Sequence, residues 1–515
     1  MILLLFLSTF ACFSLIFIYI KIKFSYWKQF NVPVVEPNFP CGSLKGVGTK
    51  IHVILLFDQI YRKLKEYGPI AGLYFFTQPA ALIMDPKVIK DILVKDFNVF
   101  HDRGLFVNEK SDPLSGHLFS LGGEKWNRLR KKLSPTFTSG KMKMMFDTIA
   151  DVSDQFKNYL EQQIDEPVNV EVKDLLSRFT TDIIGNCAFG IQCNSMLHPN
   201  SEFRNMGKKI FDTPKTKTLK FVFMSLFRGL SNLFRMKTTD DDVERFFLNL
   251  VKETIEYRRQ NNVVQKDFMN LIMNLSSEFN ANTENSIKVE QTTDINGNMN
   301  NDNMLSFEEI TAQCFVFFIA GFESSSTLMT FILYELACNS EIQERLRGHI
   351  LEELRKHNDK LTYDLTISIP YLDQVINESL RKYPALGSLS RIASKDYQIR
   401  NTNIVIRKGQ FVNIPVYSIH HDEKYYSNPE KFDPDRFTKE NVAKREPYTF
   451  LPFGAGPRSC IGLRFGLAQT RAGIITILSK FKISKCAETP EPIEFSAVSP
   501  VLASVGGMWL QMEKL

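Results

Sequence analysis

The sequence predicts a mainly α-helical protein with small β-sheets, of the α+β class, behind an N-terminal membrane anchor helix. Long stretches with helical periodicity, a few short strand-like runs and an uncharged apolar N-terminus lead to this prediction. Of the 515 residues, 44% are apolar and 23% are charged, which are globular values that exclude disordered and collagen-like chains. The chain has 43 Phe, which have no polar tip and indicate an apolar interior or an apolar pocket.

Charge and cysteine usage exclude further classes of protein. The net charge of +6 is too weak over this length to predict nucleic-acid binding. Eight Cys in a long chain do not make a disulfide scaffold, and without a C-x-x-C pair they do not indicate a zinc ribbon.

Residues 2–20 carry no charge and would span about 28 Å as a helix, close to the roughly 30 Å hydrocarbon core of a bilayer. A cleaved signal peptide is the alternative, but the run lacks a basic start, a shorter apolar core and a small-residue cleavage site. Lysines follow the run and none precedes it, which predicts that the rest of the chain is cytosolic. We expect an anchor over 1–21, a proline-rich linker over 22–45 and one large domain over 46–515.

Within the large domain, the periodicity of apolar residues predicts long helices, and short β-like runs predict small sheets. The expected helices are 141–165, 240–260, 306–339, 341–357, 371–383 and 461–480, and the expected strands lie near 71–84, 397–414 and 508–512. The stretch 276–303, which holds eight Asn, is expected to be a solvated surface loop.

The helix over 306–339 has the clearest start. Ser306 and Glu309 form a capping box, with Leu305 and Ile310 placed as a hydrophobic staple. Its centre is apolar all round, which would suit a second membrane span. Glu323 near the middle makes insertion costly, so we expect a buried core helix instead.

The segment FLPFGAGPRSCIGLRFG, residues 450–466, carries the chemistry. Glycines surround Cys460 just before a helical pattern, an arrangement that lowers the pKa of a thiol and stabilises a metal–sulfur bond. Gly456 permits a tight turn, and Gly462 permits the close approach of a flat group. Phe453 can shield the sulfur from water, and Arg458 places a cation two residues away.

This segment resembles the haem-binding signature of cytochrome P-450 monooxygenases, F-x-x-G-x-R-x-C-x-G. Other landmarks of that family follow in the expected order: Glu378 and Arg381 of an E-x-x-R helix, Arg436 of a P-x-R-F motif, Trp126 and Arg130 of a W-x-x-x-R helix, and Ala320-Gly-Phe-Glu-Ser324 of the oxygen-binding helix. Residues 134–146 and 414–426 resemble the animal microsomal detoxification branch, of the insect xenobiotic-oxidising type.

The resemblance implies a cytochrome P-450 fold with a long central helix and haem b as cofactor, with Cys460 as the axial thiolate ligand of its iron. It implies that Glu378, Arg381 and Arg436 form a buried network on the haem side of the core. The residues expected to contact the cofactor are Arg103, Trp126, Arg130, Arg391, Phe453, Arg458 and Cys460.

The same resemblance assigns proton delivery to dioxygen to Glu323 and Ser324. The family usually has Thr at the position of Ser324. Serine keeps the hydroxyl but loses the methyl group that restricts χ1, so tight coupling of NADPH use to product is in question.

The implied function is a membrane-bound monooxygenase that inserts one atom of O2 into small hydrophobic substrates, either xenobiotics or endogenous lipids. Electrons would come from NADPH through a cytochrome reductase, with cytochrome b5 as a further candidate partner, at the cytosolic face of the endoplasmic reticulum. The alternatives are a haem-thiolate isomerase or dehydratase and a non-catalytic haem protein that only binds ligands. The substrate itself is not readable from candidate pocket residues such as Phe106, Phe119, Phe315, Phe318, Ala320, Leu386 and Leu502.

Three further features of the sequence have both a functional and an ordinary structural interpretation. Lys125, Arg128, Lys131 and Lys132 form a basic face that would suit an acidic reductase or plain solvent. The apolar stretch 220–234 would suit a membrane contact or a lid over the pocket. His420 and His421 lack metal-ligand spacing, so we do not expect a metal there.

Overall fold

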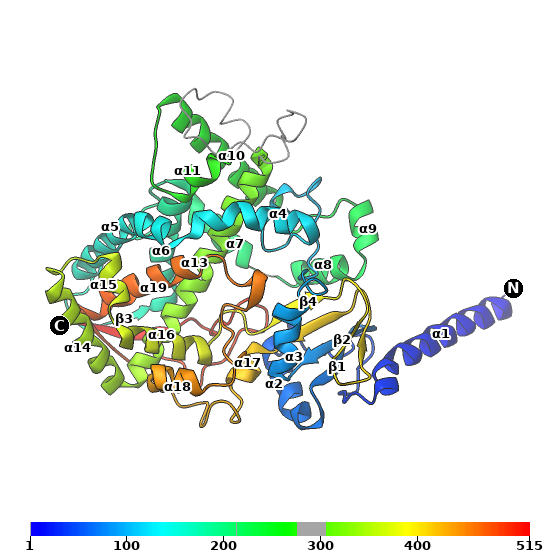
Figure 1. Cartoon of the computed structure of the whole chain (residues 1–515). Coiled ribbons are helices and arrows are strands. Elements are labelled where there is room, and N and C mark those ends of the chain that lie inside the picture. The colour runs from blue at the N-terminus through cyan, green and yellow to red at the C-terminus, as the bar shows by residue number, and fades with distance from the viewer. Residues whose placement is uncertain (1, 213, 276–304) are drawn as a thin grey trace, which may run out of the picture. The chain divides into compact units, whose positions relative to one another are not determined.

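The computed structural model describes residues 2–212, 214–275 and 305–515, and they divide into two compact units (Figure 1). Unit 1 contains Met1–Gly104, Leu380–Cys460 and Phe495–Leu502. Unit 2 contains Leu105–Ser379, Ile461–Glu494 and Ala503–Leu515. The predicted surface loop at 276–303 lies outside the described residues.

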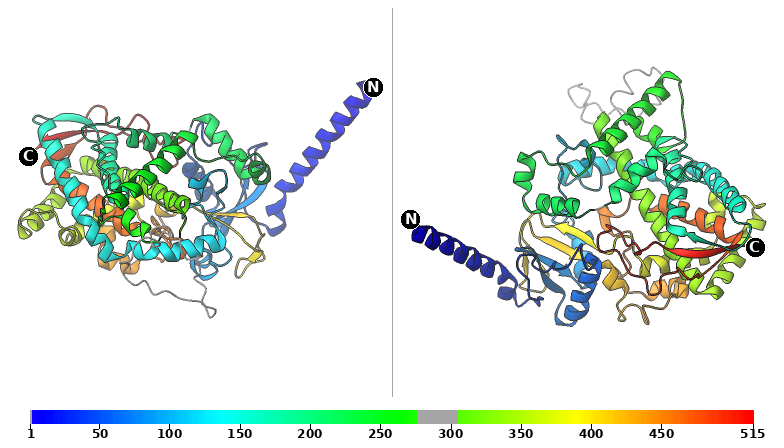
Figure 2. Two further views of the ribbon diagram at one scale, coloured as in Figure 1. Left: turned by 90° about the horizontal axis from the view of Figure 1, so that it is seen from above. Right: turned by 180° about the vertical axis from the view of Figure 1, so that it is seen from behind.

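The N-terminal residues form one continuous helix, α1 (Ile2–Phe24), which covers the predicted anchor (Figure 2). Several large apolar side chains described on it are exposed, among them Phe6, Phe10, Leu15 and Phe17. Phe24 at its end packs against Tyr74 of unit 1, and a short 3₁₀ helix, η1 (Tyr26–Phe30), follows. The described part of α1 before Phe24 therefore offers an exposed apolar surface.

The residues after α1 are tied to the sheet of unit 1. Trp27 is fully buried, and its Nε1–H donates to the carbonyl of Leu73 at 3.1 Å. The carbonyl of Pro33 accepts from the amide of Gly72 at 2.8 Å. The proline-rich stretch is thus held by backbone bonds as well as by its prolines, while its status as a linker between anchor and domain stays a prediction.

Among the residues that the structure describes, one helix has the length and hydropathy of a membrane span: α13 (Phe307–Cys338), with a mean hydropathy of 1.6. Because 67% of its apolar window is buried inside the protein, α13 is a core helix. This agrees with the expectation for 306–339.

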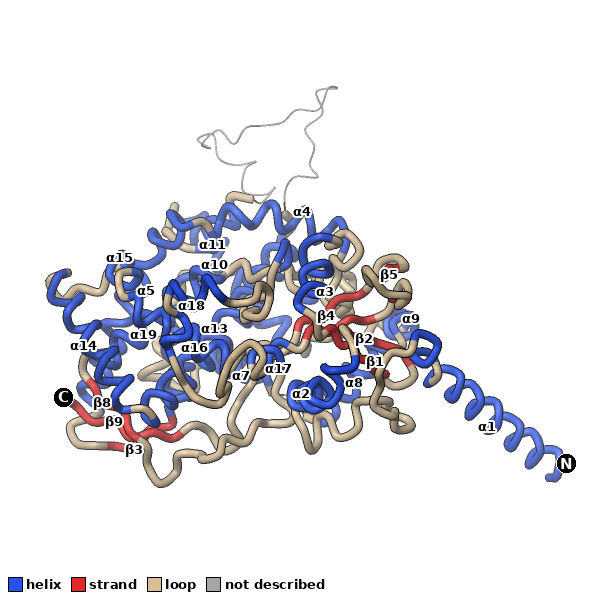
Figure 3. Tube along the Cα trace, turned by 60° about the horizontal axis from the view of Figure 1, so that its bottom comes forward, coloured by secondary structure: helices blue, strands red, loops and turns tan. Residues whose placement is uncertain are grey.

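Unit 1 contains a mixed four-stranded sheet in the order β1-β2-β7-β4, drawn in red in Figure 3. Strands β1 (Ile70–Phe75) and β2 (Gln78–Ile83) form an antiparallel hairpin, and β2 pairs in parallel with β7 (Phe411–Ile414). Strand β4 (Leu389–Ile392) pairs antiparallel with β7. A two-stranded sheet joins β5 (Tyr397–Gln398) to β6 (Val405–Ile406).

Most of the strands in unit 1 were predicted. The hairpin β1–β2 and the strands β5 to β7 fall inside the runs 71–84 and 397–414, whereas β4 was not predicted. The helices of this unit are short apart from α1: α2 (Val53–Leu64), α3 (Pro86–Lys90), α17 (Val416–His420) and α18 (Lys439–Lys444). Its apolar core includes the sheet residues Leu73, Ala81, Leu82 and Val412.

Unit 2 is helical with one small sheet, in the order β3-β9-β8. Its strands are β3 (Val168–Glu171), β8 (Phe481–Ser484) and β9 (Trp509–Lys514). Its helices are α4 (Gly123–Leu133), α5 (Ser139–Gln163), α6 (Val172–Ile184), α7 (Glu202–Phe211), α8 (Lys215–Leu226), α9 (Arg228–Leu233), α10 (Asp241–Gln260), α11 (Phe268–Met273), α13, α14 (Ser340–Lys356), α15 (Tyr363–Ile367) and α19 (Leu463–Leu478). Helix α16 (Pro370–Lys382) begins in unit 2, and its last three residues belong to unit 1.

The structure confirms the predicted mainly helical α+β class. The six predicted long helices correspond to α5, α10, α13, α14, α16 and α19, each within about two residues at either end. The predicted strand at 508–512 is β9.

Helix α13 begins with the predicted capping box. The Ser306 hydroxyl accepts from the amide of Glu309 at 3.2 Å, and the Glu309 carboxylate accepts from the amide of Ser306 at 3.0 Å. Leu305 and Ile310, the expected staple, are both buried. These contacts satisfy amides that a helix start leaves without partners.

Helix α13 packs against α6, α10 and α19 in unit 2. Phenylalanine rings fill the contacts with α10 and α7: Phe315 lies 5.0 Å from Phe247 of α10 between ring centroids, and Phe318 lies 4.7 Å from Phe203 of α7. Both residues were candidate pocket walls, and both are buried in the core. The richness in phenylalanine thus serves the interior of this unit.

A buried arginine organises the C-terminal part of unit 1. Arg381 has no exposed surface, and it donates to the carbonyls of His420 at 3.0 Å and Pro429 at 2.7 Å. Arg436 donates to the carbonyl of Asn428 at 3.0 Å, next to Pro429. Glu378 and Arg381 are both fully buried and Arg436 is half-buried, so the network of these three residues stays a prediction.

Candidate active site

The loop that carries Cys460, residues 450–460, is folded back on itself by backbone hydrogen bonds. The amide of Cys460 donates to the carbonyl of Phe453 at 2.9 Å, and the amide of Gly454 donates to the carbonyl of Leu451 at 3.0 Å. Gly456 has a φ of +70°, and a Cβ atom there would lie 2.0 Å from the carbonyl oxygen of Leu93. Only glycine fits this position, as the sequence predicted.

The loop is anchored to the buried arginine through one histidine. The amide of Leu451 donates to Nε2 of His420 at 2.9 Å, and Nδ1 of His420 lies 3.1 Å from the carbonyl of Arg381. Nε2 must therefore accept, so Nδ1 carries the proton and donates. Burial lowers the pKa of His420, which keeps the ring neutral as this pattern requires. Both ring nitrogens are bonded to backbone, so neither is available to a metal.

Cys460 is exposed, whereas the other cysteines that the structure describes are buried or half-buried. Cys187 and Cys314 are fully buried, and burial raises the pKa of their thiols. Cys460 stands three residues before the first residue of α19. Its loop thus presents an accessible sulfur, whereas the two buried thiols are inert packing groups.

Three of the predicted arginines gather in unit 1, although they come from distant parts of the sequence. Arg458 is buried, and its Nε–H donates to the carbonyl of His101 at 2.7 Å. Arg103 donates to the carbonyl of Arg458 at 3.1 Å. Asp102 pairs with Ile392 as a β-bridge, which brings this segment beside β4 and its Arg391.

Arg391 differs from the other two in its partners. Its side chain is buried and donates through Nη1 to the carbonyl of Ser390 at 2.8 Å. Its Nε is buried without a hydrogen-bond partner among the described residues. Burial lowers the pKa of Arg391 to about 10, and no acidic group offsets this.

Trp126 and Arg130 lie on α4, four residues apart and therefore on one face. Trp126 is buried and Arg130 is half-buried. Of the predicted basic face, Lys125, Arg128 and Lys131 are exposed, whereas Lys132 is half-buried.

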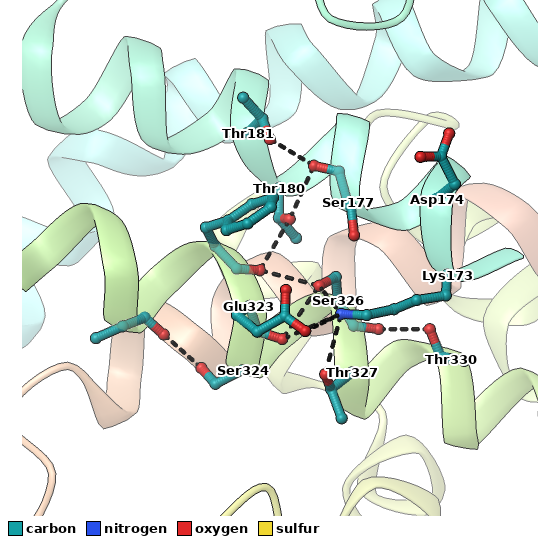
Figure 4. A network of polar contacts seen from close by, with 12 residues as sticks. Lys173, Asp174, Ser177, Thr180, Thr181, Glu323, Ser324, Ser326, Thr327 and Thr330 are labelled. Atoms are coloured by element: carbon teal, nitrogen blue, oxygen red, sulfur yellow. Dashed lines mark hydrogen bonds and ion pairs between the residues drawn. The ribbon is translucent and has the colours of Figure 1, made fainter. Parts of the chain in front are cut away.

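Glu323 and Ser324 lie near the middle of α13 in unit 2 (Figure 4). The carboxylate of Glu323 forms an ion pair with Lys173 of α6, with Nζ and Oε1 2.9 Å apart. The hydroxyl of Ser324 donates to the carbonyl of Ala320, one turn earlier, at 2.6 Å. Both groups are half-buried, and the side chain of Ala320 beside them is exposed.

The backbone of α13 around Glu323 accepts hydrogen bonds from other elements. The carbonyl of Gly321 accepts from the Gln469 amide of α19 at 3.0 Å. The carbonyl of Phe322 accepts from the Thr180 hydroxyl of α6 at 3.0 Å. Helix α13 is therefore fastened on two sides where the predicted acid and hydroxyl lie.

Sequence reasoning did not find Lys173, Thr180 or Gln469. They lie about 150 residues from Glu323 in either direction, and none belongs to a motif with a fixed spacing. A helix-periodic pattern shows that α6 has a buried face, but not which buried helix that face meets.

The comparisons with known proteins agree with the arrangement of these residues. A profile of the cytochrome P450 family matches residues 37–509. "Probable cytochrome P450 6a14" of Drosophila melanogaster is 44% identical over 503 residues, which cover 97% of each chain. "Cytochrome P450 6a2" of the same organism is 42% identical over 96% of each chain. "Cytochrome P450 6A1" of Musca domestica is 40% identical over 98% of this chain and 96% of its own.

Matches of this length and identity, together with an exposed thiol in a glycine-framed loop, determine the class of protein. The chain belongs to the cytochrome P450 family and is a haem-thiolate monooxygenase.

Proposed function

We propose that this P450 is attached to the endoplasmic reticulum membrane and oxidises small hydrophobic molecules, xenobiotics among them, with electrons that a reductase takes from NADPH. The observation that carries the proposal is an exposed apolar surface on α8 and α9 that would face the lipid from which such substrates come. The same proposal assigns Cys460 as the ligand, the arginines as propionate contacts, and Glu323 with Ser324 as the proton relay.

The residues of unit 1 fit a haem that carries two carboxylate groups. When bound, haem with a thiolate ligand supplies the oxygen chemistry. Arg391 offers a buried guanidinium whose Nε has no partner among the described residues, and a carboxylate would be the natural acceptor for it. Arg103 and Arg458 of the same unit complete the propionate contacts proposed there, and Phe453 would shield the sulfur of Cys460 from water. Trp126 and Arg130, proposed for the same role by resemblance, lie on α4 of unit 2.

Gly462 supports the presence of a flat group near the sulfur. A Cβ atom added there would have no atom of the described residues within 4 Å, and its φ is not in the left-handed region. The folded chain thus gives no reason of its own for glycine at 462. The close approach of a planar cofactor is such a reason.

Glu323 and Ser324 would deliver protons to the dioxygen substrate. Glu323 carries the ionisable group, and Ser324 carries a hydroxyl that can donate after it leaves the carbonyl of Ala320. Serine has more accessible χ1 states than threonine, so its hydroxyl is held in the productive direction for less of the time. We therefore expect coupling in this chain to be looser than threonine would allow.

The apolar surface on α8 and α9 supports a second attachment to the membrane besides α1. Phe227, Leu230, Leu233 and Phe234 are all exposed, with Leu233 at 73%. Lysines precede the patch in the sequence, as is typical of an interfacial helix next to anionic lipid, and Lys208, Lys209 and Lys217 of α7 and α8 pair with aspartates. Such a surface would be costly to leave in water.

The exposed basic face of α4 supports reductase docking. Lys125 pairs with Glu109 and Arg128 with Glu309, while Lys131 is exposed. Exposed pairs of this kind contribute little free energy and exchange partners easily. Acidic residues of a reductase, or of cytochrome b5, could replace Glu109 and Glu309 without a large cost.

The proposed function is tested by reconstituting the full-length protein with NADPH–cytochrome reductase in vesicles and screening a library of hydrophobic compounds. We expect oxygenated products whose formation requires both NADPH and the reductase. Product formation without either component, or ligand binding with no turnover across the library, would contradict the proposal.

Replacing Arg391 should have opposite effects on cofactor retention and on the stability of the protein without haem. Arg391→Met should speed haem dissociation by about tenfold or more, since hydrogen bonds to charged groups contribute about 1.5–3 kcal/mol. In the haem-depleted protein the same change should raise the free energy of unfolding by about 1–3 kcal/mol, because an unpaired buried cation is removed. Haem transfer to a scavenger protein and urea unfolding measure the two effects.

Arg391→Lys is the matched control, since it keeps the cation and should retain more haem than Arg391→Met. Unchanged haem retention in a folded Arg391→Met protein would show that Arg391 does not hold the cofactor.

Ser324→Ala should uncouple the enzyme, with NADPH still consumed while product falls and hydrogen peroxide rises. The loss of the hydroxyl should lower product per NADPH by about tenfold, below the 10²–10⁴-fold range of general acid–base catalysis because water can partly replace it. Ser324→Thr should raise product per NADPH where the packing tolerates one more methyl group. Unchanged coupling in Ser324→Ala would assign the relay to Glu323 and water alone.

Deleting residues 2–21 should move the protein only partly out of the membrane fraction. The apolar surface of α8 and α9 should keep the truncated protein attached at low salt, and raising the salt should release it, because part of that attraction is electrostatic. Flotation with anionic vesicles measures the binding. Leu233→Asp with Phe234→Asp should abolish the residual attachment, and full solubility of the truncated protein at low salt would argue that α8 and α9 are only a lid.

A further inference from the structure

A polar cluster joins α6 to α13 beside the proposed proton relay, and the proposed function uses only Glu323 from it. Nζ of Lys173 lies 2.9 Å from Oε1 of Glu323, and it donates to the hydroxyls of Ser326 at 2.7 Å and Thr327 at 3.0 Å (Figure 4). The same ammonium also lies 3.5 Å from the carbonyl of Glu323, so its three N–H donors all face α13. Lys173 therefore links the carboxylate of Glu323 to the next turn of the same helix.

Lys173 is itself held in place at its backbone. It is the second residue of α6, and the Glu171 carboxylate caps this helix by accepting from the amides of Lys173 at 3.2 Å and Asp174 at 2.6 Å. The amide of Met508 donates to the same carboxylate at 2.7 Å. The start of α6 is thus fixed to the sheet of unit 2, so the position of Lys173 is well defined relative to α13.

Thr180, two turns further along α6, makes a second contact with the same part of α13. Its hydroxyl donates to the carbonyl of Phe322, which also accepts from the Ser326 hydroxyl, each at 3.0 Å. Serine hydroxyls that bond to carbonyls of the preceding turn compete with the helical bonds and loosen a helix. Thr180 and Lys173 compensate for this loosening from outside the helix.

The charge of Lys173 is costly where it lies. Its side chain is 21% exposed and that of Glu323 is 13% exposed. Burial lowers the pKa of Lys173, although the carboxylates of Glu323 and Glu171 oppose the shift. A well-packed apolar residue in such a place is often as stable as a buried ion pair, so the pair calls for a reason other than stability.

We propose that Lys173 is a positioning residue for Glu323, and that Thr180 of the same helix is a second one. The ammonium of Lys173 fixes the place of the Glu323 carboxylate, and the hydroxyl of Thr180 holds the carbonyl of Phe322. The proposal rests on the proposed role of Glu323 in proton delivery. Lys173 does not itself contact dioxygen or substrate.

The test uses the holoenzyme reconstituted with reductase and compares product and hydrogen peroxide formed per NADPH. Lys173→Met should lower product per NADPH by at least about twofold, which is the low end of the coupling measured between contacting residues. Substrate affinity should stay unchanged, because the change acts on proton delivery. Lys173→Arg, which keeps the cation, should restore part of the loss.

The matched control is Arg178→Met on the same helix. Arg178 pairs with Asp174 at 2.7 Å within α6 and is similarly exposed at 23%. Arg178→Met should keep the coupling ratio of the unchanged protein, since a general weakening of α6 is not the proposed cause.

A double-mutant cycle separates positioning from general stability. Glu323→Gln should lower coupling on its own, and Lys173→Met should then have no further effect in the Glu323→Gln background. A role of Lys173 in stability alone would lower coupling by the same factor in both backgrounds.

Hydrogen exchange supplies a readout that does not depend on activity. Lys173→Met and Thr180→Val should each speed amide exchange at residues 322–328 of α13 by about twofold or more, while Arg178→Met should not. Thr180→Val keeps the shape of the side chain and removes only the hydroxyl. It therefore tests the hydrogen bond of Thr180 to Phe322 even where Lys173→Met folds poorly.

The outcomes distinguish the two proposals. Normal coupling in Glu323→Gln would overturn the relay role of Glu323, and with it the positioning role of Lys173. Lowered coupling in Glu323→Gln together with normal coupling in Lys173→Met would overturn the positioning role alone. Equal effects of Lys173→Met in both backgrounds, or failure of Lys173→Arg to restore any coupling, would likewise contradict positioning.

Discussion

The rest of the site depends on one constraint: a thiol must be exposed at the end of a loop that is itself firmly held. Gly456 meets this constraint, because its left-handed backbone lies against the carbonyl of Leu93 where a Cβ atom would not fit. The same loop is bonded through Leu451 to His420, and through His420 to the buried Arg381. The neutral, buried His420 thus holds the cysteine loop in a fixed position relative to the core of unit 1. The E-x-x-R motif, which has no chemistry of its own, acquires its importance in this way.

Much of the fold could be predicted from the sequence, because the long helices of unit 2 have a strong 3.6-residue period and clear ends. The capping box at Ser306 and Glu309 placed the start of α13 to within one residue. Strand β4 escaped prediction because four residues that include an arginine and a serine have no usable period. Nothing in the local sequence indicated that the chain would divide into two units assembled from interleaved segments, since that division depends on contacts between distant residues.

The candidate site was predictable where a motif has fixed spacing and not where it depends on long-range pairing. Cys460, Gly456 and Arg458 stand in one short segment, and their order alone points to a thiolate ligand. Arg103 and Arg391 were named through resemblance, and the structure adds that Arg391 is buried with an unpartnered Nε. Lys173 could not have been found in advance. Its contact with Glu323 spans 150 residues, and its local surroundings look like the ordinary start of an amphipathic helix.

Ligation of the iron by the sulfur of Cys460 is the central claim, and the absorption spectrum of the reduced protein with bound carbon monoxide tests it most directly. Thiolate ligation predicts a strongly red-shifted Soret band for the unchanged protein, and loss of that band in Cys460→Ser. Cys486→Ser, at a half-buried cysteine, should keep the band and serves as the control. An imidazole-like spectrum in the folded, unchanged protein, or a red-shifted band that survives in Cys460→Ser, would contradict the account.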